Sequence, residues 1–222
     1  SYSVDLSNVL NQLSEDISNG RVTWKEYELI ESNSTDYYRR EITWNVFNEK
    51  ANRFANLLLQ RGVKKGDKVA ILMMNGLEWL PIYFGILKTG ALAVPLNFRY
   101  SADEIKYCVE LAEADCNTKM CKILVGGKKD GWHDFNEEYS IFSSHFDRKE
   151  DAPCGSDPML MFFTSGTSGY PKLAAHNYKY PLGHFITAKY WHRVNPDGLH
   201  LTISDTGWAK SMWGKLYGQW LC

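Results

Sequence analysis

The stretch KVAILMMNGLEWLPIYFGILKTGALAVPL, residues 68–96, decides the fold class of this chain. It opens with a continuous apolar run at residues 69–74, which has the length of a strand buried on both faces. A helix is expected over residues 77–88, and Gly90 follows it as a usual helix stop. A second apolar run, residues 91–96, comes next. Strand, helix and strand joined by short links predict a parallel α/β sheet.

Helices are expected on both sides of this stretch. Thr43 suits the N-cap of a helix running to about Arg61, because its apolar residues recur at spacings of three and four. Ser101 suits the N-cap of another helix, about Ala102–Ala114. Three further elements are expected: a strand at residues 122–125, a helix at roughly 180–191 and a strand around 199–203. The predicted fold class is therefore α/β, with partly parallel sheets flanked by helices.

Composition and patterning bound the function classes. Residues 1–40 are polar and weakly patterned, with a short helix expected around residues 6–17, whereas residues 41–222 have the pattern of a globular domain. The net charge of −1 gives no general attraction to nucleic acid or to an anionic membrane. No stretch approaches the roughly 20 apolar residues that span a bilayer, and the first residues lack the pattern of a secretory signal. We therefore expect a cytoplasmic protein.

The cysteines indicate neither a disulfide framework nor a metal site. They are odd in number, irregularly spaced and without a CxxC pair or zinc-ligand spacing. Free thiols in a reducing compartment are expected. The five are Cys108, Cys116, Cys121, Cys154 and Cys222.

A glycine-rich loop directly follows the apolar segment at residues 158–163. Residues 164–172, TSGTSGYPK, combine hydroxyls, glycines and a lysine, which suits the binding of a polyphosphate. The spacing is not that of a Walker A loop, because Pro171 precedes Lys172 and no Gly-Lys-Ser/Thr opens a helix. On composition alone, a phosphate cradle and a solvated Ser/Gly turn remain equally open.

Longer strings decide between these two readings. FTSGTSGYPK, residues 163–172, resembles the phosphate loop of the adenylate-forming superfamily, which includes acyl-CoA synthetases, luciferases and peptide-synthetase adenylation domains. LKTGALAVPL, residues 87–96, is similar to a segment of that family's N-terminal domain. SDTGWA, residues 204–209, and the Gly-Trp and Phe at 131–135 resemble the medium-chain and acetyl-CoA synthetase branch. The resemblance runs from about residue 42 to residue 222 and implies part of the large N-terminal ATP- and acyl-binding domain.

The resemblance implies an AMP-forming acid–thiol ligase that joins a small carboxylic acid to CoA through an acyl-adenylate, using ATP and Mg²⁺. Lys172 would then neutralise charge on the departing pyrophosphate. His176 would support packing of the loop. The loop residues implied to hold the β- and γ-phosphates are Thr164, Ser165, Gly166, Thr167, Ser168 and Gly169. The residues implied to border the acyl pocket are Trp208, Lys210 and Trp213.

The resemblance also breaks in two places. The family's adenine-binding segment, its ribose-binding aspartate and its C-terminal domain with a catalytic lysine have no counterpart in this sequence, so the chain alone is expected to be inactive. The stretch after Asp115 is shorter than is usual in the family. Two alternatives stay open: a non-catalytic protein that keeps the fold, and a peptide-synthetase adenylation domain, against which residues 204–208 argue. Neither the acid nor the oligomeric state follows from the sequence.

Overall fold

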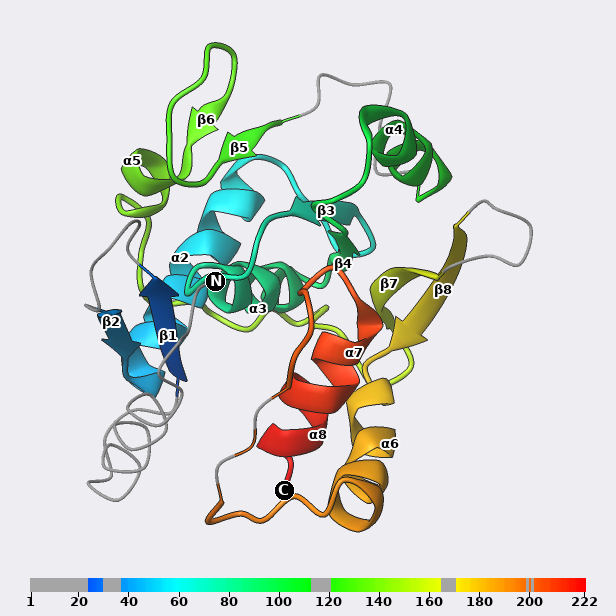
Figure 1. The fold of residues 1–222 in the computed structure, drawn as a ribbon. Helices are drawn as coiled ribbons and strands as arrows, with labels where there is room; N and C mark the ends of the chain where they lie inside the picture. Colours follow the sequence, from blue (N-terminus) through cyan, green and yellow to red (C-terminus); the bar gives the residue numbers. More distant parts are fainter. Residues whose placement is uncertain (1–23, 30–36, 113–120, 165–170, 199, 201) are drawn as a thin grey trace.

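A computed structural model describes residues 24–29, 37–112, 121–164, 171–198, 200 and 202–222 (Figure 1). The helix expected around residues 6–17 lies outside these ranges. Within them, no helix combines the length and the apolar character needed to cross a bilayer.

A four-stranded sheet in the order β3-β4-β7-β8 forms the centre of the fold. Its strands are β3 (Lys68–Leu72), β4 (Leu92–Leu96), β7 (Pro158–Thr164) and β8 (Lys172–Asn177). The first three are parallel, and β8 is antiparallel to β7. All five residues of β4 are buried, as expected for an inner strand covered on both faces. The predicted α/β class is confirmed, whereas β8 was not predicted.

Helices α2 (Trp44–Gln60) and α3 (Trp79–Thr89) pack against each other beside this sheet (Figure 1). Gly85 permits their close approach, because a Cβ at this position would lie 2.9 Å from the carbonyl oxygen of Ala51. The predicted N-cap of α2 is confirmed, since the Thr43 hydroxyl accepts a backbone hydrogen bond in the first turn. These helices supply half of the buried residues of the main apolar core.

Helix α4 (Ala102–Leu111) covers another part of the sheet. Its predicted start is confirmed by a capping box, in which Ser101 and Glu104 each bond the other's backbone N–H. The helix contributes to a second apolar cluster near the ends of β4 and β7. The buried members of this cluster are Val94, Leu96, Cys108, Ala112 and Phe163.

The C-terminal region is helical. It contains α6 (Tyr180–Ile186), the π-helical turn η1 (Thr187–Trp191), α7 (Ala209–Ser211), the π-helical turn η2 (Met212–Leu216) and α8 (Tyr217–Trp220). The helix expected at 180–191 is thus present as two consecutive pieces.

The strand expected around residues 199–203 was wrong for the described residues 200, 202 and 203, which form no strand. This segment does not pair with a strand, and hydrogen bonds to the following helical turn hold it in place. The Lys215 ammonium donates to the carbonyl oxygen of His200 at 3.0 Å. The Thr202 hydroxyl donates to the carbonyl oxygen of Gly214 at 2.8 Å.

Three contacts between aromatic residues attach the C-terminal region to α2 and α3. The hydroxyls of Tyr83 and Tyr217 are hydrogen-bonded to each other in the buried core. The Trp220 ring stacks on Phe84, with ring centroids 6.1 Å apart, and meets Trp44 edge-on at 4.8 Å. These contacts bring together residues that are more than 130 positions apart in the sequence.

Two small strand pairs complete the fold. Strands β1 (Trp24–Leu29) and β2 (Tyr37–Ile42) are antiparallel, in a region whose sequence indicated no strand. Strands β5 (Ile123–Leu124) and β6 (His133–Asp134) pair in parallel, and α5 (Phe135–Tyr139) follows directly. The strand predicted at residues 122–125 is therefore confirmed, although it is shorter than expected.

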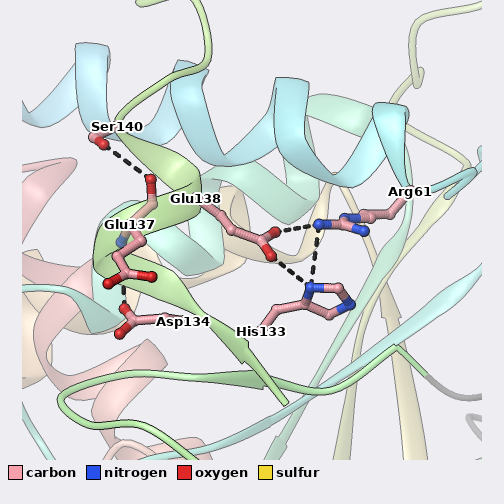
Figure 2. A network of polar contacts seen from close by, with 6 residues as sticks. All are labelled: Arg61, His133, Asp134, Glu137, Glu138 and Ser140. Atoms are coloured by element: carbon pink, nitrogen blue, oxygen red, sulfur yellow. Dashed lines mark hydrogen bonds and ion pairs between the residues drawn. The ribbon is translucent and has the colours of Figure 1, made fainter. Parts of the chain in front are cut away.

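A polar network joins this small unit to the end of α2. Figure 2 shows the Glu138 carboxylate between the Arg61 guanidinium and the His133 ring, with both of which it forms hydrogen bonds. Arg61 also lies 3.2 Å from Nδ1 of His133. Burial by itself would raise the pKa of Glu138, but the hydrogen bonds and charges of Arg61 and His133 lower it below its usual value.

The Tyr83–Tyr217 pair predicts non-additive stability effects. Tyr217→Phe leaves the Tyr83 hydroxyl buried without its partner, which costs about 1–3 kcal/mol. The double variant Tyr83→Phe/Tyr217→Phe removes both polar groups, so its loss of unfolding free energy should be smaller than the sum of the two single losses. Urea denaturation of the four proteins measures this coupling. Additive losses would show that the two hydroxyls do not depend on each other.

The network in Figure 2 predicts a pH-dependent contribution to stability. A carboxylate with a lowered pKa stabilises the fold above its unfolded pKa, about 4.3, and this stabilisation disappears as the pH falls through the folded pKa. We expect Glu138→Gln to lower the unfolding free energy at pH 7 by up to about 1 kcal/mol. The difference from wild type should vanish in strongly acidic buffer. Urea denaturation between neutral and strongly acidic pH measures this difference. Glu49→Gln, at an exposed position on α2, is the control. A difference between Glu138→Gln and wild type that is the same at every pH would contradict the role of the Glu138 carboxylate.

Candidate functional site

The glycine-rich loop is the connection of the β7–β8 hairpin. Thr164 and Lys172 stand opposite each other in the strand register, where the loop begins and ends. The Thr164 hydroxyl donates to the carbonyl oxygen of Lys172 at 3.3 Å, and both residues are exposed. The other predicted phosphate-binding residues, Ser165, Gly166, Thr167, Ser168 and Gly169, lie outside the described residues.

Helix α4 contacts the far end of the same loop. The Tyr107 hydroxyl donates to the carbonyl oxygen of Pro171 at 3.4 Å. Phe163, which precedes Thr164, packs in the apolar cluster formed with α4. The two ends of the loop are thus fixed to the sheet and to α4, while Thr164 and Lys172 remain accessible to a ligand.

The segment at residues 204–208, which contains the predicted pocket residue Trp208, lies at the same end of the sheet as Thr164. Strands β4 and β7 are parallel, with Ala93 paired to Leu160, so both strands end at this edge. The chain entering α7 runs up to β4 (Figure 1). A Cβ on Gly207 would lie 2.5 Å from the carbonyl oxygen of Leu96, the last residue of β4. The carboxyl end of the sheet therefore holds both Thr164, where the phosphate loop begins, and the 204–208 segment, although the two are distant in sequence.

Two side chains that follow β3 and β4 hold the 204–208 segment, and neither was predicted from the sequence. Asn75 forms two hydrogen bonds with the segment's backbone. The Arg99 guanidinium pairs with the Asp205 carboxylate at 3.2 Å. The only signal in the sequence was their position just after buried strands, where the chain leaves the carboxyl edge of a parallel sheet.

The predicted pocket residues lie in different surroundings. Trp208 precedes α7 and is 42% exposed, and Lys210 is exposed on α7. The Trp213 ring stacks on His192, with centroids 5.7 Å apart and planes 16° from parallel. Of the three, Trp208 is the one within the 204–208 segment, and it directly follows Gly207, which packs on the end of β4.

His176 lies on β8, opposite Leu160 of β7 in the strand register. Its ring is 3.9 Å from the Tyr180 ring and 6.4 Å from that of Phe162, measured between centroids. Burial lowers its pKa, so the neutral imidazole is favoured at neutral pH. These contacts place His176 among residues of β7 and α6, and its predicted support of the loop stays a prediction.

A hollow of about 620 Å³ lies elsewhere, around the loop that joins β5 and β6. Its lining mixes both signs of charge, so it offers no concentrated positive potential for a polyphosphate. The charged residues of the lining are Lys128, Lys129, Asp130, Asp134, Glu137 and Glu138. This hollow is therefore not assigned to the candidate site.

Comparisons with known proteins agree with this geometry. A family model described as AMP-binding enzyme matches residues 29–219. The chain is 27% identical over 205 residues to the mitochondrial acyl-coenzyme A synthetase ACSM3 of Pongo abelii, covering 82% of this chain and 34% of that protein. It is 28% identical over 195 residues to 4-hydroxybutyrate–CoA ligase 1 of Metallosphaera sedula, covering 80% and 33%. The chain thus spans about a third of the length of these relatives.

The fold is also similar to that of a solved structure. The acyl-CoA synthetase of Brucella canis matches with a TM-score of 0.73 at 22% identity, covering 85% of this chain and 37% of that one. At this identity the likeness concerns the fold alone.

The packing of the 204–208 segment on β4 predicts that a side chain added at Gly207 lowers the stability of the fold. Gly207→Ala places a methyl group against backbone atoms of Leu96 and Asn97, which cannot rotate away, and we expect a loss of about 1–3 kcal/mol of unfolding free energy. Gly183→Ala on α6 is the matched control, because its Cβ would meet nothing within 4 Å. Alanine should there be neutral or stabilising by up to about 1 kcal/mol. Urea denaturation measures both, and equal effects would contradict the close packing of Gly207.

Proposed function

The chain belongs to the AMP-binding enzyme family, and from this premise we propose that it is the nucleotide- and acid-binding part of an AMP-forming acyl-CoA synthetase. In this proposal residues 41–222 form part of the ATP- and acyl-binding domain. The names of the two relatives described above, an acyl-coenzyme A synthetase and a CoA ligase, support acid–thiol ligation rather than a peptide-synthetase role.

One observation carries the proposal: strands β4 and β7 end at the same edge of the sheet. That edge holds Thr164, the first residue of the phosphate loop, and Gly207, which packs on the last residue of β4. Ligands of α/β proteins bind beyond the carboxyl ends of parallel strands. A site that must bring a phosphate chain and a carboxylic acid together requires this adjacency.

The proposed reaction has two displacements. A carboxylate oxygen of the acid attacks the α-phosphorus of ATP, and the bond from that phosphorus to the pyrophosphate oxygen breaks. The thiolate sulfur of CoA then attacks the carbonyl carbon of the acyl-adenylate, and AMP leaves. In the first step the chain contributes by position and charge. Hydroxyls and backbone N–H groups of residues 164–169 hold the β- and γ-phosphates, while Lys172 neutralises charge on the departing pyrophosphate.

Magnesium is proposed to enter with ATP. In the described part of the chain, no group of three or more His, Cys, Asp and Glu side chains is arranged to hold a metal. Mg²⁺ is commonly bound through substrate phosphates and few protein carboxylates. The ion would supply further charge neutralisation at the phosphates.

The acid is proposed to bind beside the 204–208 segment. Trp208 offers an aromatic surface for an apolar acyl group, and Lys210 offers a cation for its carboxylate. Trp213 is assigned to the more distant wall of the pocket. A cytoplasmic location remains part of the proposal, while the Pongo abelii relative is named as mitochondrial.

The test is ATP- and acid-dependent release of pyrophosphate by the full-length protein that contains this chain. Across a panel of short, branched, medium-chain and aryl acids, we expect release with at least one acid. Lys172→Ala should lower kcat/KM for ATP by roughly 100-fold, because a cation at the developing charge is lost.

Lys106→Ala is the matched control, since this lysine is on α4 with its side chain 74% exposed. It should leave the rate unchanged. A full-length protein that releases no pyrophosphate with any acid would overturn the synthetase proposal and favour a non-catalytic role for the fold. The same rate loss in both variants would remove Lys172 from its proposed role.

A further inference from the structure

Asn75 connects two parts of the candidate site that are far apart in the sequence. It follows β3 by three residues, at the carboxyl edge of the sheet. Its side-chain Nδ2 donates to the carbonyl oxygen of Ser204 at 3.1 Å. Its Oδ1 accepts from the backbone N–H of Thr206 at 2.9 Å. The amide group therefore uses a donor and an acceptor on the same short segment.

The pattern of these two bonds is that of a parallel β-ladder. In an extended chain, the carbonyl of one residue and the N–H of the residue two positions later point to the same side. A residue on a neighbouring parallel strand bonds both groups. The Asn75 side chain takes the place of that residue, so it fixes the distance and the rotation of Ser204–Thr206 relative to β3.

The other attachments leave this rotation less constrained. The Arg99–Asp205 ion pair has an arginine side chain that is 67% exposed, and exposed pairs of this kind contribute little. Gly207 sets how close the segment comes to β4 but offers no directional bond there. The Thr206 hydroxyl is buried and has no hydrogen-bond partner among the described residues. The Thr206 carbonyl oxygen accepts a hydrogen bond from the Ser211 hydroxyl at 3.4 Å, so the 2.9 Å bond from its N–H to Asn75 is the shorter of its two backbone contacts.

We propose that Asn75 is a positioning residue for the carboxylic acid: it holds the 204–208 segment on the sheet edge and thereby sets the orientation of Trp208. This inference rests on the proposed function. Because Asn75 acts through the 204–208 segment rather than through the phosphate loop, its loss affects acid binding and leaves ATP binding intact. Trp208 comes two residues after Thr206, and its backbone N–H donates to Asp205 at 3.0 Å, so a rotation of the segment moves its ring.

The experiment compares Asn75 variants of the full-length protein in the pyrophosphate assay. Asn75→Ala removes both hydrogen bonds and should raise KM for the acid about tenfold, with KM for ATP unchanged. Asn75→Asp keeps an acceptor for the Thr206 N–H but loses the donor to Ser204. Its KM for the acid should therefore lie between the values of wild type and Asn75→Ala. Asn136→Ala, an exposed position on α5, is the control and should leave both KM values unchanged.

Hydrogen exchange at the Thr206 amide provides a readout that does not depend on activity. It should be faster in Asn75→Ala than in wild type. Unchanged exchange would overturn the hydrogen-bonding role of Asn75. Faster exchange with an unchanged KM for the acid, or with equal losses for acid and ATP, would overturn the positioning role. A wild-type protein that releases no pyrophosphate would overturn the proposed function, and the exchange rates alone would then decide whether Asn75 holds the segment.

Discussion

The parallel pairing of β4 with both β3 and β7 is the constraint on which the rest of the structure depends. Every residue of β4 is buried, so this strand can only exist with a partner on each side and helices on both faces. Parallel pairing in turn aligns the carboxyl ends of three strands at one edge. Thr164, where the phosphate loop begins, and the 204–208 segment lie at the same end of the sheet because those strand ends coincide.

The aromatic contacts of the C-terminal region keep the second half of the site in place. The chain travels far from the sheet through α6 and η1 before it returns to β4 (Figure 1). The Tyr83–Tyr217 hydrogen bond and the stacking of Trp220 on Phe84 anchor the helices that follow the returning segment. Buried aromatic pairs of this kind combine a large apolar area with a defined orientation. Residues 204–220 therefore link the core packing around α3 to the geometry of the candidate site at the end of β4.

Sequence reasoning succeeded where the signal was local. The strands β3 and β4 and the caps at Thr43 and Ser101 depend on neighbouring residues, and the structure has all four. The expectation that the first apolar run is buried on both faces was wrong for β3, because β3 is the terminal strand of the described sheet and its Leu72 is 45% exposed. Prediction from the sequence failed where contacts between distant residues determine the local structure. A strand was expected around residues 199–203, but His200 and Thr202 are held by hydrogen bonds to Lys215 and Gly214 rather than by a neighbouring strand. The β1–β2 pair had no pattern in the sequence that marked it.

The sequence by itself determined the class of the fold, the family and the residue types of the phosphate loop, because strand burial, helix capping and a nine-residue motif are all encoded within short windows. Only the tertiary structure decided how the 204–208 segment is attached. Asn75 and Arg99 reach it across more than 100 residues of sequence, and an asparagine after a strand has no local feature that reveals its partner. The pairing exists because parallel strands end together, and that alignment belongs to the folded sheet rather than to any one stretch of chain.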